Sequence, residues 1–156
     1  MTAPARPLPA PSLYEQDFYA WANEQAALLR AGKLAAADIE NIAEEIESIG
    51  RSEKRELVSR LTVLLQNLLK WRFQPDRRGR SWEATITLQH DDLVDHLHDN
   101  PSLRAMLPEV VARAYGTAIV MAEGETDLSR SSFPAACPWS IEQIIAQDFW
   151  PDAATL

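Results

Sequence analysis

The segment 52–73 constrains the fold of this chain more than any other, because its apolar residues recur at helical spacing on two adjacent stripes. One stripe holds Leu57, Leu61, Leu64, Leu68 and Trp71, and the other holds Val58, Leu65 and Leu69. At 100° per residue the two stripes cover an arc of about 160°, more than a helix with one buried face needs. We therefore predict that 52–73 is a central helix, contacted by several neighbours.

Two helices are expected before this segment. Ser12 and Glu15 have capping-box spacing, and Gly32 is a natural stop, which predicts a helix over 13–31. The second helix is expected over 35–49, where isoleucines make a narrow seam of a/d-like spacing: Ile39, Ile42, Ile46 and Ile49. Gly50 permits a break after it, although a continuous helix through one glycine costs only about 1 kcal/mol.

Further helices are expected after the central one. Pro75 ends the central helix, and Ser81 is the expected N-cap of a fourth helix that continues to Leu97. A short turn over 101–106 and a helix over 108–124 follow, because Asn100-Pro101 is a strong start signal. Ser140 and Gln143 repeat the capping-box spacing and predict a last short helix, which ends at Pro151.

These segments predict an all-α fold: one helical bundle of about six helices, mostly with antiparallel neighbours, around 52–73. We expect a single domain over 12–151, preceded by a disordered or extended arm over 1–11 that contains four prolines, and followed by a tail over 152–156. A chain of 156 residues is long enough to bury a core without disulfides.

Composition limits the classes of partner. The formal net charge of −8 disfavours a polyanion as the main partner. The single cysteine, Cys137, excludes an internal disulfide and suits a reducing compartment. The N-terminal sequence has no apolar core of a secretory signal, and we find no apolar run of about 20 residues. We therefore expect a cytoplasmic protein, not held in a membrane and without a cofactor.

All three histidines lie within 90–98, among several aspartates. Asp92, His96 and Asp99 share one helix face at spacing i, i+4, i+7, and imidazole with carboxylate ligands can hold Zn²⁺. The segment lacks the H-E-x-x-H arrangement, so a solvated polar helix face is the competing interpretation. Glu40, Glu44 and Glu47 have the same spacing on the second helix and the same two interpretations.

A basic segment over 70–82 combines arginines with aromatic side chains. Its candidate binding residues are Trp71, Arg77, Arg78, Arg80 and Trp82. Arginine beside exposed aromatic rings can bind phosphate or stack on bases. The competing interpretation is internal: the arginines pair with the acidic face 40–47 or hydrogen-bond the last carbonyls of the central helix.

Four stretches together resemble a bacterial family known as a domain of unknown function, the twenty-ninth in that series. They are Tyr14 to Phe18 with Trp21; Asn41 to Gly50, continuing into Glu53 and Glu56-Leu57; Leu68 to Trp71 with Gln74-Pro75, Arg77-Arg78 and Ser81-Trp82; and Phe133-Pro134 with Cys137 to Ser140. The resemblance implies a compact helical bacterial protein without an assigned reaction or catalytic residue. We expect a buried polar network among its charged residues Asp17, Glu44, Glu45 and Lys70.

Three functions compete on this evidence. A non-enzymatic interaction or regulatory module, with another protein or a second copy as partner, is favoured because no G-x-S-x-G, P-loop or G-x-G-x-x-G is present. A nucleic-acid-associated protein would use the basic loop 70–82. A metal-dependent enzyme would use the cluster 90–99.

Overall fold

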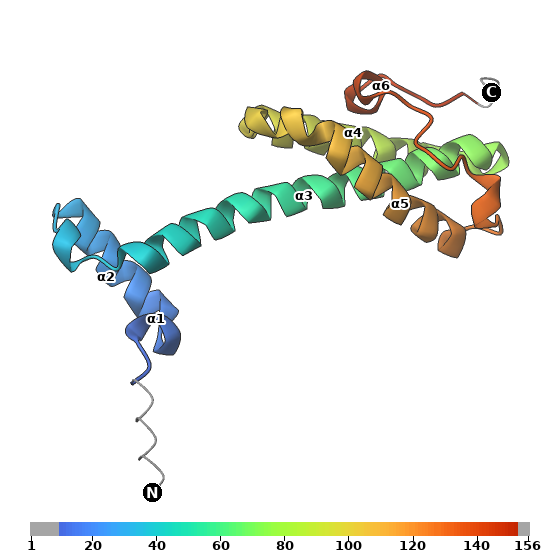
Figure 1. Cartoon of the computed structure of the whole chain (residues 1–156). Helices are drawn as coiled ribbons and strands as arrows, with labels where there is room; N and C mark the ends of the chain where they lie inside the picture. Colours follow the sequence, from blue (N-terminus) through green and yellow to red (C-terminus); the bar gives the residue numbers. More distant parts are fainter. Residues whose placement is uncertain (1–9, 153–156) are drawn as a thin grey trace, which may run out of the picture. The chain divides into compact units, whose positions relative to one another are not determined.

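A computed structural model describes residues 10–152, and within this range the chain is helical and contains no strand (Figure 1). The α-helices are α1 (Leu13–Gln16), α2 (Phe18–Arg30), α3 (Ile39–Phe73), α4 (Arg80–Asp99), α5 (Leu107–Glu125) and α6 (Ile141–Ile145). The predicted all-α fold of six helices is confirmed. By their contacts the residues fall into two compact units, Met1–Gly50 and Arg51–Leu156, and the predicted single domain over 12–151 stays a prediction.

Helix α3 joins two segments that the sequence suggested as separate helices. It runs for 35 residues from Ile39 to Phe73, so of the two alternatives left open at Gly50 the continuous helix is the one found, and the expectation of two separate helices is wrong. A Cβ built at Gly50 would meet no atom within 4 Å, so no tertiary contact requires a glycine there. The good helix formers on both sides of Gly50 outweigh its cost of about 1 kcal/mol. The first residues of the predicted second helix instead form a 3₁₀ turn, Leu34–Ala36.

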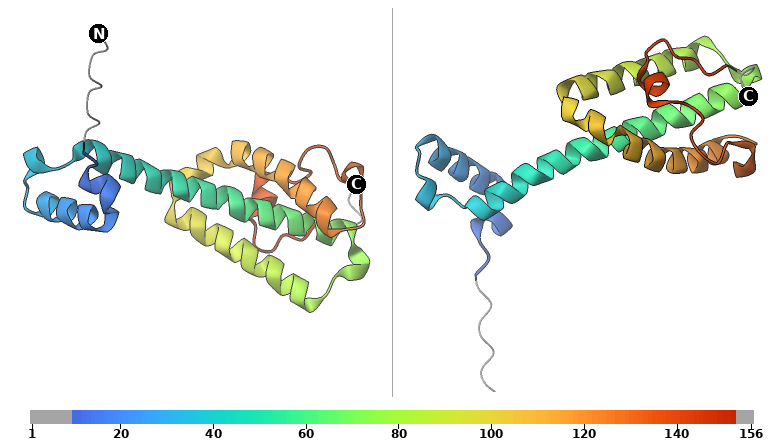
Figure 2. Two further views of the ribbon diagram at one scale, coloured as in Figure 1. Left: turned by 90° about the horizontal axis from the view of Figure 1, so that it is seen from below. Right: turned by 45° about the horizontal axis from the view of Figure 1, so that its top comes forward.

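The core of the C-terminal unit is built on the second half of α3. Six leucines of α3 have no exposed surface: Leu57, Leu61, Leu64, Leu65, Leu68 and Leu69. Figure 2 shows α4 and α5 lying along this half of α3, one on each side, with α6 near them. The leucines therefore belong to one core cluster with Ile86, Leu93 and Leu97 of α4 and the buried face of α5. This confirms 52–73 as the segment on which the helices of the C-terminal unit, α4, α5 and α6, pack.

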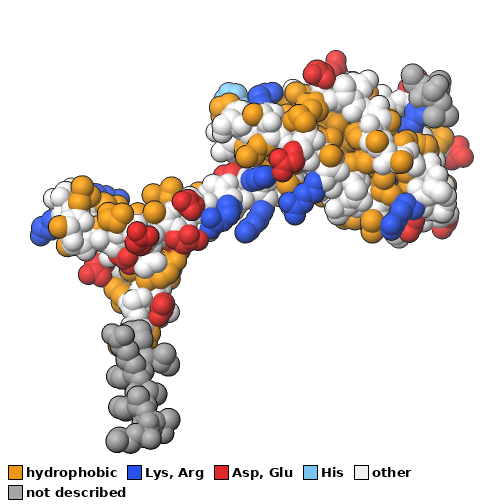
Figure 3. All heavy atoms as spheres, in the orientation of Figure 1, with side chains coloured by type: hydrophobic (Ala, Val, Ile, Leu, Met, Phe, Trp, Pro, Cys, Tyr) orange, Lys and Arg blue, Asp and Glu red, His pale blue; other side chains and the backbone are white. Residues whose placement is uncertain are grey.

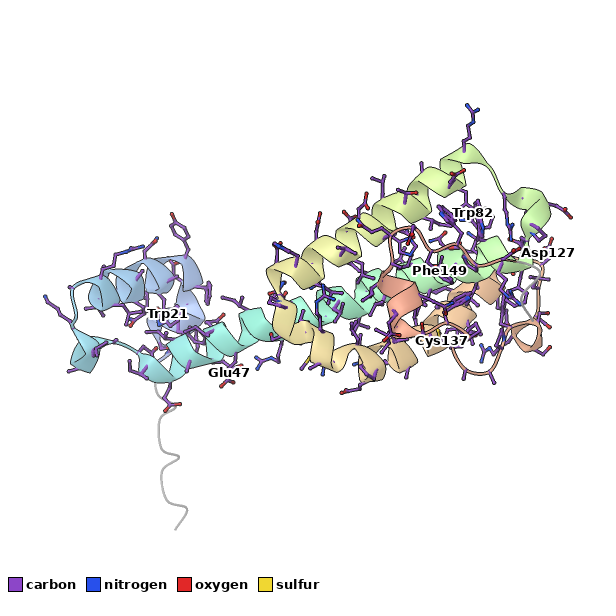
Figure 4. All side chains as sticks on the ribbon, turned by 90° about the horizontal axis from the view of Figure 1, so that it is seen from above. Trp21, Glu47, Trp82, Asp127, Cys137 and Phe149 are labelled. Atoms are coloured by element: carbon purple, nitrogen blue, oxygen red, sulfur yellow. The ribbon has the colours of Figure 1, made fainter. Side chains whose placement is uncertain are left out.

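The N-terminal unit is held by a small polar and aromatic cluster. Trp21 of α2 is 5% exposed, and its Nε1 donates to Asp38 at 3.0 Å (Figure 4). Gln25 accepts a bond from the Asp38 backbone N–H at 2.7 Å. Tyr14 donates to Glu45 of α3. These bonds fix α1 and α2 against the start of α3.

Several capping signals act as the sequence predicted. Ser140 and Gln143 form a complete capping box at α6. Gly32 has φ +71°, and the Gly32 and Lys33 N–H groups bond back to Leu29 and Leu28, which is a Schellman motif that ends α2. Pro101 begins a 3₁₀ helix, Pro101–Met106, directly before α5.

Two other helix starts differ from the prediction. Ser12 is the N-cap of α1 but its side chain makes no capping bond, and Asp17 interrupts the predicted helix 13–31 because its side chain caps α2 through the Ala20 N–H. Helix α4 begins at Arg80 with Gly79 as N-cap, so Ser81 is inside the helix.

One helical segment of the described residues, Pro101–Glu125, is long and apolar enough to cross a membrane, judged by length and composition alone. The sequence alone was expected to contain no apolar run of about 20 residues, and this segment differs from that expectation. Here its apolar residues supply the core face of α5, including Val110, Val111, Ala114 and Ala118. The core helix of a soluble protein can have the same length and apolar composition.

Candidate metal centre

His96 of α4 is the group around which the candidate site is built. Its side chain is 6% exposed. Its Nε2 lies 3.0 Å from the backbone oxygen of Glu53, and a carbonyl only accepts, so Nε2 carries the proton. In the neutral ring Nδ1 then holds the lone pair. This nitrogen lies 3.7 Å from Glu53 Oε2 and 3.8 Å from Glu56 Oε2.

Three ligand atoms of the right chemistry therefore converge on one point. The ligand atoms of Glu53, Glu56 and His96 lie within 4.8 Å of one another. With zinc–ligand bonds of 2.0–2.2 Å, neighbouring ligand atoms of a tetrahedral site are about 3.4 Å apart. The separations from Nδ1 exceed this by a few tenths of an ångström, and no pair in the set is more than 4.8 Å apart, so side-chain rotations must draw the three ligands together around one ion.

Each of the three ligands is oriented by a second group. Arg60 donates to Glu56 Oε1, from Nη2 at 2.5 Å and from Nε at 3.0 Å, which leaves Oε2 facing His96. Asn100 donates to Glu53 Oε2 at 3.3 Å, the same oxygen that faces His96 Nδ1, and the Glu53 carbonyl holds His96. The Arg60 hydrogen bond also lowers the pKa of Glu56, against the opposing effect of burial, and so keeps it ionised. Outer-shell bonds of this kind are typical of metal ligands.

The three ligands open into a polar groove of about 520 Å³ between α3 and α4. Three further carboxylates line it: Asp92, Asp95 and Asp99. Arg60 also lines the groove, and its Nη1 lies 3.4 Å from Asp92 Oδ2. Five carboxylates facing one arginine make the groove strongly negative, which favours a cation.

The sequence prediction of Asp92, His96 and Asp99 found this groove but only one of its convergent ligands. Asp92 is held by Arg60, and Asp99 lies 3.8 Å from the exposed His98. The partners of His96 come from α3, within about one turn before its leucine stripe, which begins at Leu57. Glu53 and Glu56 were singled out in the sequence only as part of a family pattern.

Comparison with known families shows the relationship of this chain. The sequence model of a family described as a domain of unknown function, DUF29, matches residues 13–150. The chain belongs to the DUF29 family. Comparisons with curated proteins and with solved structures found no match. The three ligands and their anchoring groups all lie within the part that matches DUF29.

The aromatic residues of the basic segment are used internally in this DUF29 chain. Trp82 Nε1 donates to Asn67 at 3.2 Å, and Lys70 lies over the Trp82 ring at 5.5 Å. Trp71 packs on the rings of Trp82 and Trp150, with centroids 5.6 and 4.8 Å apart. Figure 4 shows Trp82 on α4, within the C-terminal unit. Neither ring is an open platform for a base.

The arginines of this segment divide into inward and outward ones. Arg78 Nε donates to the Trp71 carbonyl at 2.7 Å and its guanidinium lies over the Trp71 ring at 4.9 Å. This is the predicted alternative in which an arginine satisfies a carbonyl near the end of the central helix. Arg77 is exposed and lies 3.7 Å from Asp127, and Arg80 is exposed.

The four residues expected to form a buried polar network have separate roles. Asp17 is exposed and caps α2, and Glu45 accepts from Tyr14. Glu44 is exposed in the N-terminal unit. Lys70 donates to Glu125 at 2.9 Å in the C-terminal unit.

Cys137 lacks the features of a reactive thiol. Burial raises its pKa, which disfavours the nucleophilic thiolate. Its Sγ lies 3.6 Å from the Trp139 carbonyl. The structure thus favours the role of a packed apolar residue for Cys137.

Proposed function

We propose that this DUF29 chain is a metal-binding protein that holds one divalent transition-metal ion between α3 and α4, with Glu53, Glu56 and His96 as ligands. The observation that supports the proposal most strongly is the state of His96. Its Nε2 donates to a backbone carbonyl, so its Nδ1 faces two carboxylates, and in the neutral ring this nitrogen offers a buried lone pair. Without a cation or a proton at Nδ1, three electron-rich atoms lie close together and repel one another. A bound cation would remove this repulsion.

The ligand set indicates the class of ion. Imidazole nitrogen suits Zn²⁺, Fe²⁺, Cu²⁺ and Ni²⁺, whereas Mg²⁺ and Ca²⁺ prefer oxygen ligands only. Three protein ligands leave a fourth tetrahedral position for water, as in catalytic zinc sites. Glu53 and Glu56 are 39% and 43% exposed, so that position is open to the groove. A metal-activated water is the chemistry this centre would supply.

Zn²⁺ should raise the melting temperature of the purified protein. An ion at a hundredfold excess over its dissociation constant stabilises the folded state by about 2.7 kcal/mol. For a domain of this size we expect a shift of about 5–10 °C, measured by calorimetry. Elemental analysis of protein purified without chelator should find about one metal ion per chain.

Variants separate this site from general binding to acidic surface. His96→Gln, Glu53→Gln and Glu56→Gln should each abolish the zinc-induced shift. His98→Gln is the matched control, because His98 lies two residues away, is 86% exposed and faces Asp99 rather than the site. An equal shift in His96→Gln and the wild type, or no bound metal at all, would refute the proposal.

A second candidate function is self-association through the N-terminal unit, favoured by its exposed isoleucines. Ile39, Ile46 and Ile49 of α3 are 53%, 64% and 64% exposed. Figure 3 shows hydrophobic side chains interleaved with acidic ones on the visible face of this unit. Isoleucines at a/d-like spacing can pair with the same stripe of a second copy, and Ala43 and Gly50 beside it allow a close approach.

Replacing Ile46 by aspartate should convert a dimer into a monomer in sedimentation velocity, because a charge would then enter the paired stripe. Leu88→Asp is the matched control, since Leu88 is 62% exposed on α4 and lies outside the stripe. A wild-type chain that stays monomeric at every concentration, or a dimer unaffected by Ile46→Asp, would exclude this interface.

A further inference from the structure

Arg72, in the last turn of α3, is an arginine buried inside the C-terminal unit. The residue is 7% exposed. Its Nη1 donates to the backbone carbonyl of Asp152 at 2.5 Å, and its guanidinium lies over the Phe73 ring at 5.2 Å. Within the described residues its Nε has no hydrogen-bond partner. A buried donor without an acceptor is unfavourable, and a bound anion would satisfy it.

The guanidinium borders a small pocket with aromatic walls. The pocket has a volume of about 190 Å³ and is lined by the rings of Trp139, Phe149 and Trp150 and by two prolines, Pro138 and Pro151. Figure 4 places Phe149 in the segment that follows α6. Aromatic walls beside a few convergent polar groups are common features of small-molecule sites. The volume admits one ring or a short acyl chain.

The polar groups of this pocket suit a ligand that carries a carboxylate. One edge of a guanidinium carries Nε and Nη2, and their two N–H groups match the two oxygens of a carboxylate. The Asp152 carbonyl accepts only from Nη1 of Arg72, so it does not use this edge. Gln143 also lines the pocket. Its Oε1 accepts from the Ser140 N–H at 2.9 Å, which leaves its Nε2 as a donor. Asp152 lines the pocket as well, and its negative charge weakens the preference for anions.

We propose that this pocket binds a small organic acid with an aromatic or short aliphatic body, whose carboxylate meets Arg72 and whose body packs on Trp139, Phe149 and Trp150. The site is separate from Glu53, Glu56 and His96, and the inference does not depend on metal binding. It assigns a ligand class to a part of the chain that the metal centre does not use.

Benzoate is a suitable probe, with benzamide as its neutral match. Titration followed by the indole N–H signals in ¹⁵N NMR spectra should show saturable shifts of Trp139 and Trp150, assigned through Trp→Phe variants. We expect benzamide to bind at least about tenfold more weakly, because it lacks the charge that pairs with the guanidinium. Inorganic phosphate should shift these signals less than benzoate, because it has no apolar body.

Two variants test the role of Arg72. Arg72→Lys keeps the positive charge but loses the planar edge, and should weaken benzoate binding about tenfold. Asp152→Asn removes the opposing carboxylate and should tighten it, which keeps the test informative if Arg72→Lys does not fold. Arg80→Gln, on the surface, should change nothing. Benzoate and benzamide binding equally, phosphate displacing benzoate from the same signals, or no shift at Trp139 and Trp150 would overturn the inference.

Discussion

Replacing Leu65 by alanine should lower the free energy of unfolding by about 2–5 kcal/mol. Leu65 has no exposed surface and lies in the core cluster that joins α3 to α4 and α5. Truncation removes buried methyl groups and leaves a cavity, because neighbouring helices relax only partly. Denaturant unfolding followed by circular dichroism measures the change.

Leu88→Ala is the control for this substitution. Leu88 is 62% exposed, so the same change of side chain should alter stability by no more than about 0.5 kcal/mol. Equal effects of the two substitutions would show that the leucine stripe of α3 is not the centre of the core.

Replacing His90 by leucine should stabilise the protein by about 1–3 kcal/mol, the cost of leaving a buried polar group unpaired. His90 has no exposed surface, and within residues 10–152 neither ring nitrogen meets the geometry of a hydrogen bond, although the Ile144 main chain is near enough to favour the charged ring. Leucine has a similar volume and no polar atom. The expected rise in melting temperature is about 2–10 °C, measured by calorimetry at neutral pH.

The same residue should make stability depend on pH. Burial lowers the pKa of His90, against opposing effects of Asp91, the Ile144 main chain and Asp148. The unfolded chain therefore takes up this proton first, near the ordinary histidine pKa of about 6.5, and the folded state is favoured above that pH. Stability should fall as the pH drops below about 6.5, until the folded protein also binds the proton.

Comparing His90→Leu with the wild type from pH 7.5 down to 5 isolates this contribution. The variant should lose less stability on acidification, whereas His98→Gln, which changes an exposed histidine, should retain the wild-type slope. Parallel curves for His90→Leu and wild type would mean that His90 is not held neutral by burial.

Much of the fold was predictable from periodicity and capping residues. The leucine stripes fixed the buried faces of 52–73, and Gly32 and Ser140 marked helix ends because their local chemistry needs no tertiary partner. Gly50 was misjudged, since one glycine cannot outweigh favourable residues on both sides. The break at Asp17 was also missed, although its cap on the Ala20 N–H is as local as that of Ser140, because the capping-box spacing of Ser12 and Glu15 suggested one helix from 13 onward.

The candidate site was only half predictable. The spacing of Asp92, His96 and Asp99 describes one face of α4, but the ligands of a site between helices depend on how the helices pack. Glu53 and Glu56 lie one turn apart on α3, with Arg60 one further turn on, and this run of charge just before the leucine stripe was the available signal. Identifying Glu53 and Glu56 as the partners of His96 required the position of its Nδ1 in the folded structure.

A crystal structure of the zinc-soaked protein, with anomalous data collected at the zinc absorption edge, tests the central proposal most directly. We expect one strong anomalous peak within bonding distance of His96 Nδ1 and of one carboxylate oxygen each from Glu53 and Glu56. A peak at other residues, or no peak at a saturating zinc concentration, would contradict the assignment of a metal centre between α3 and α4.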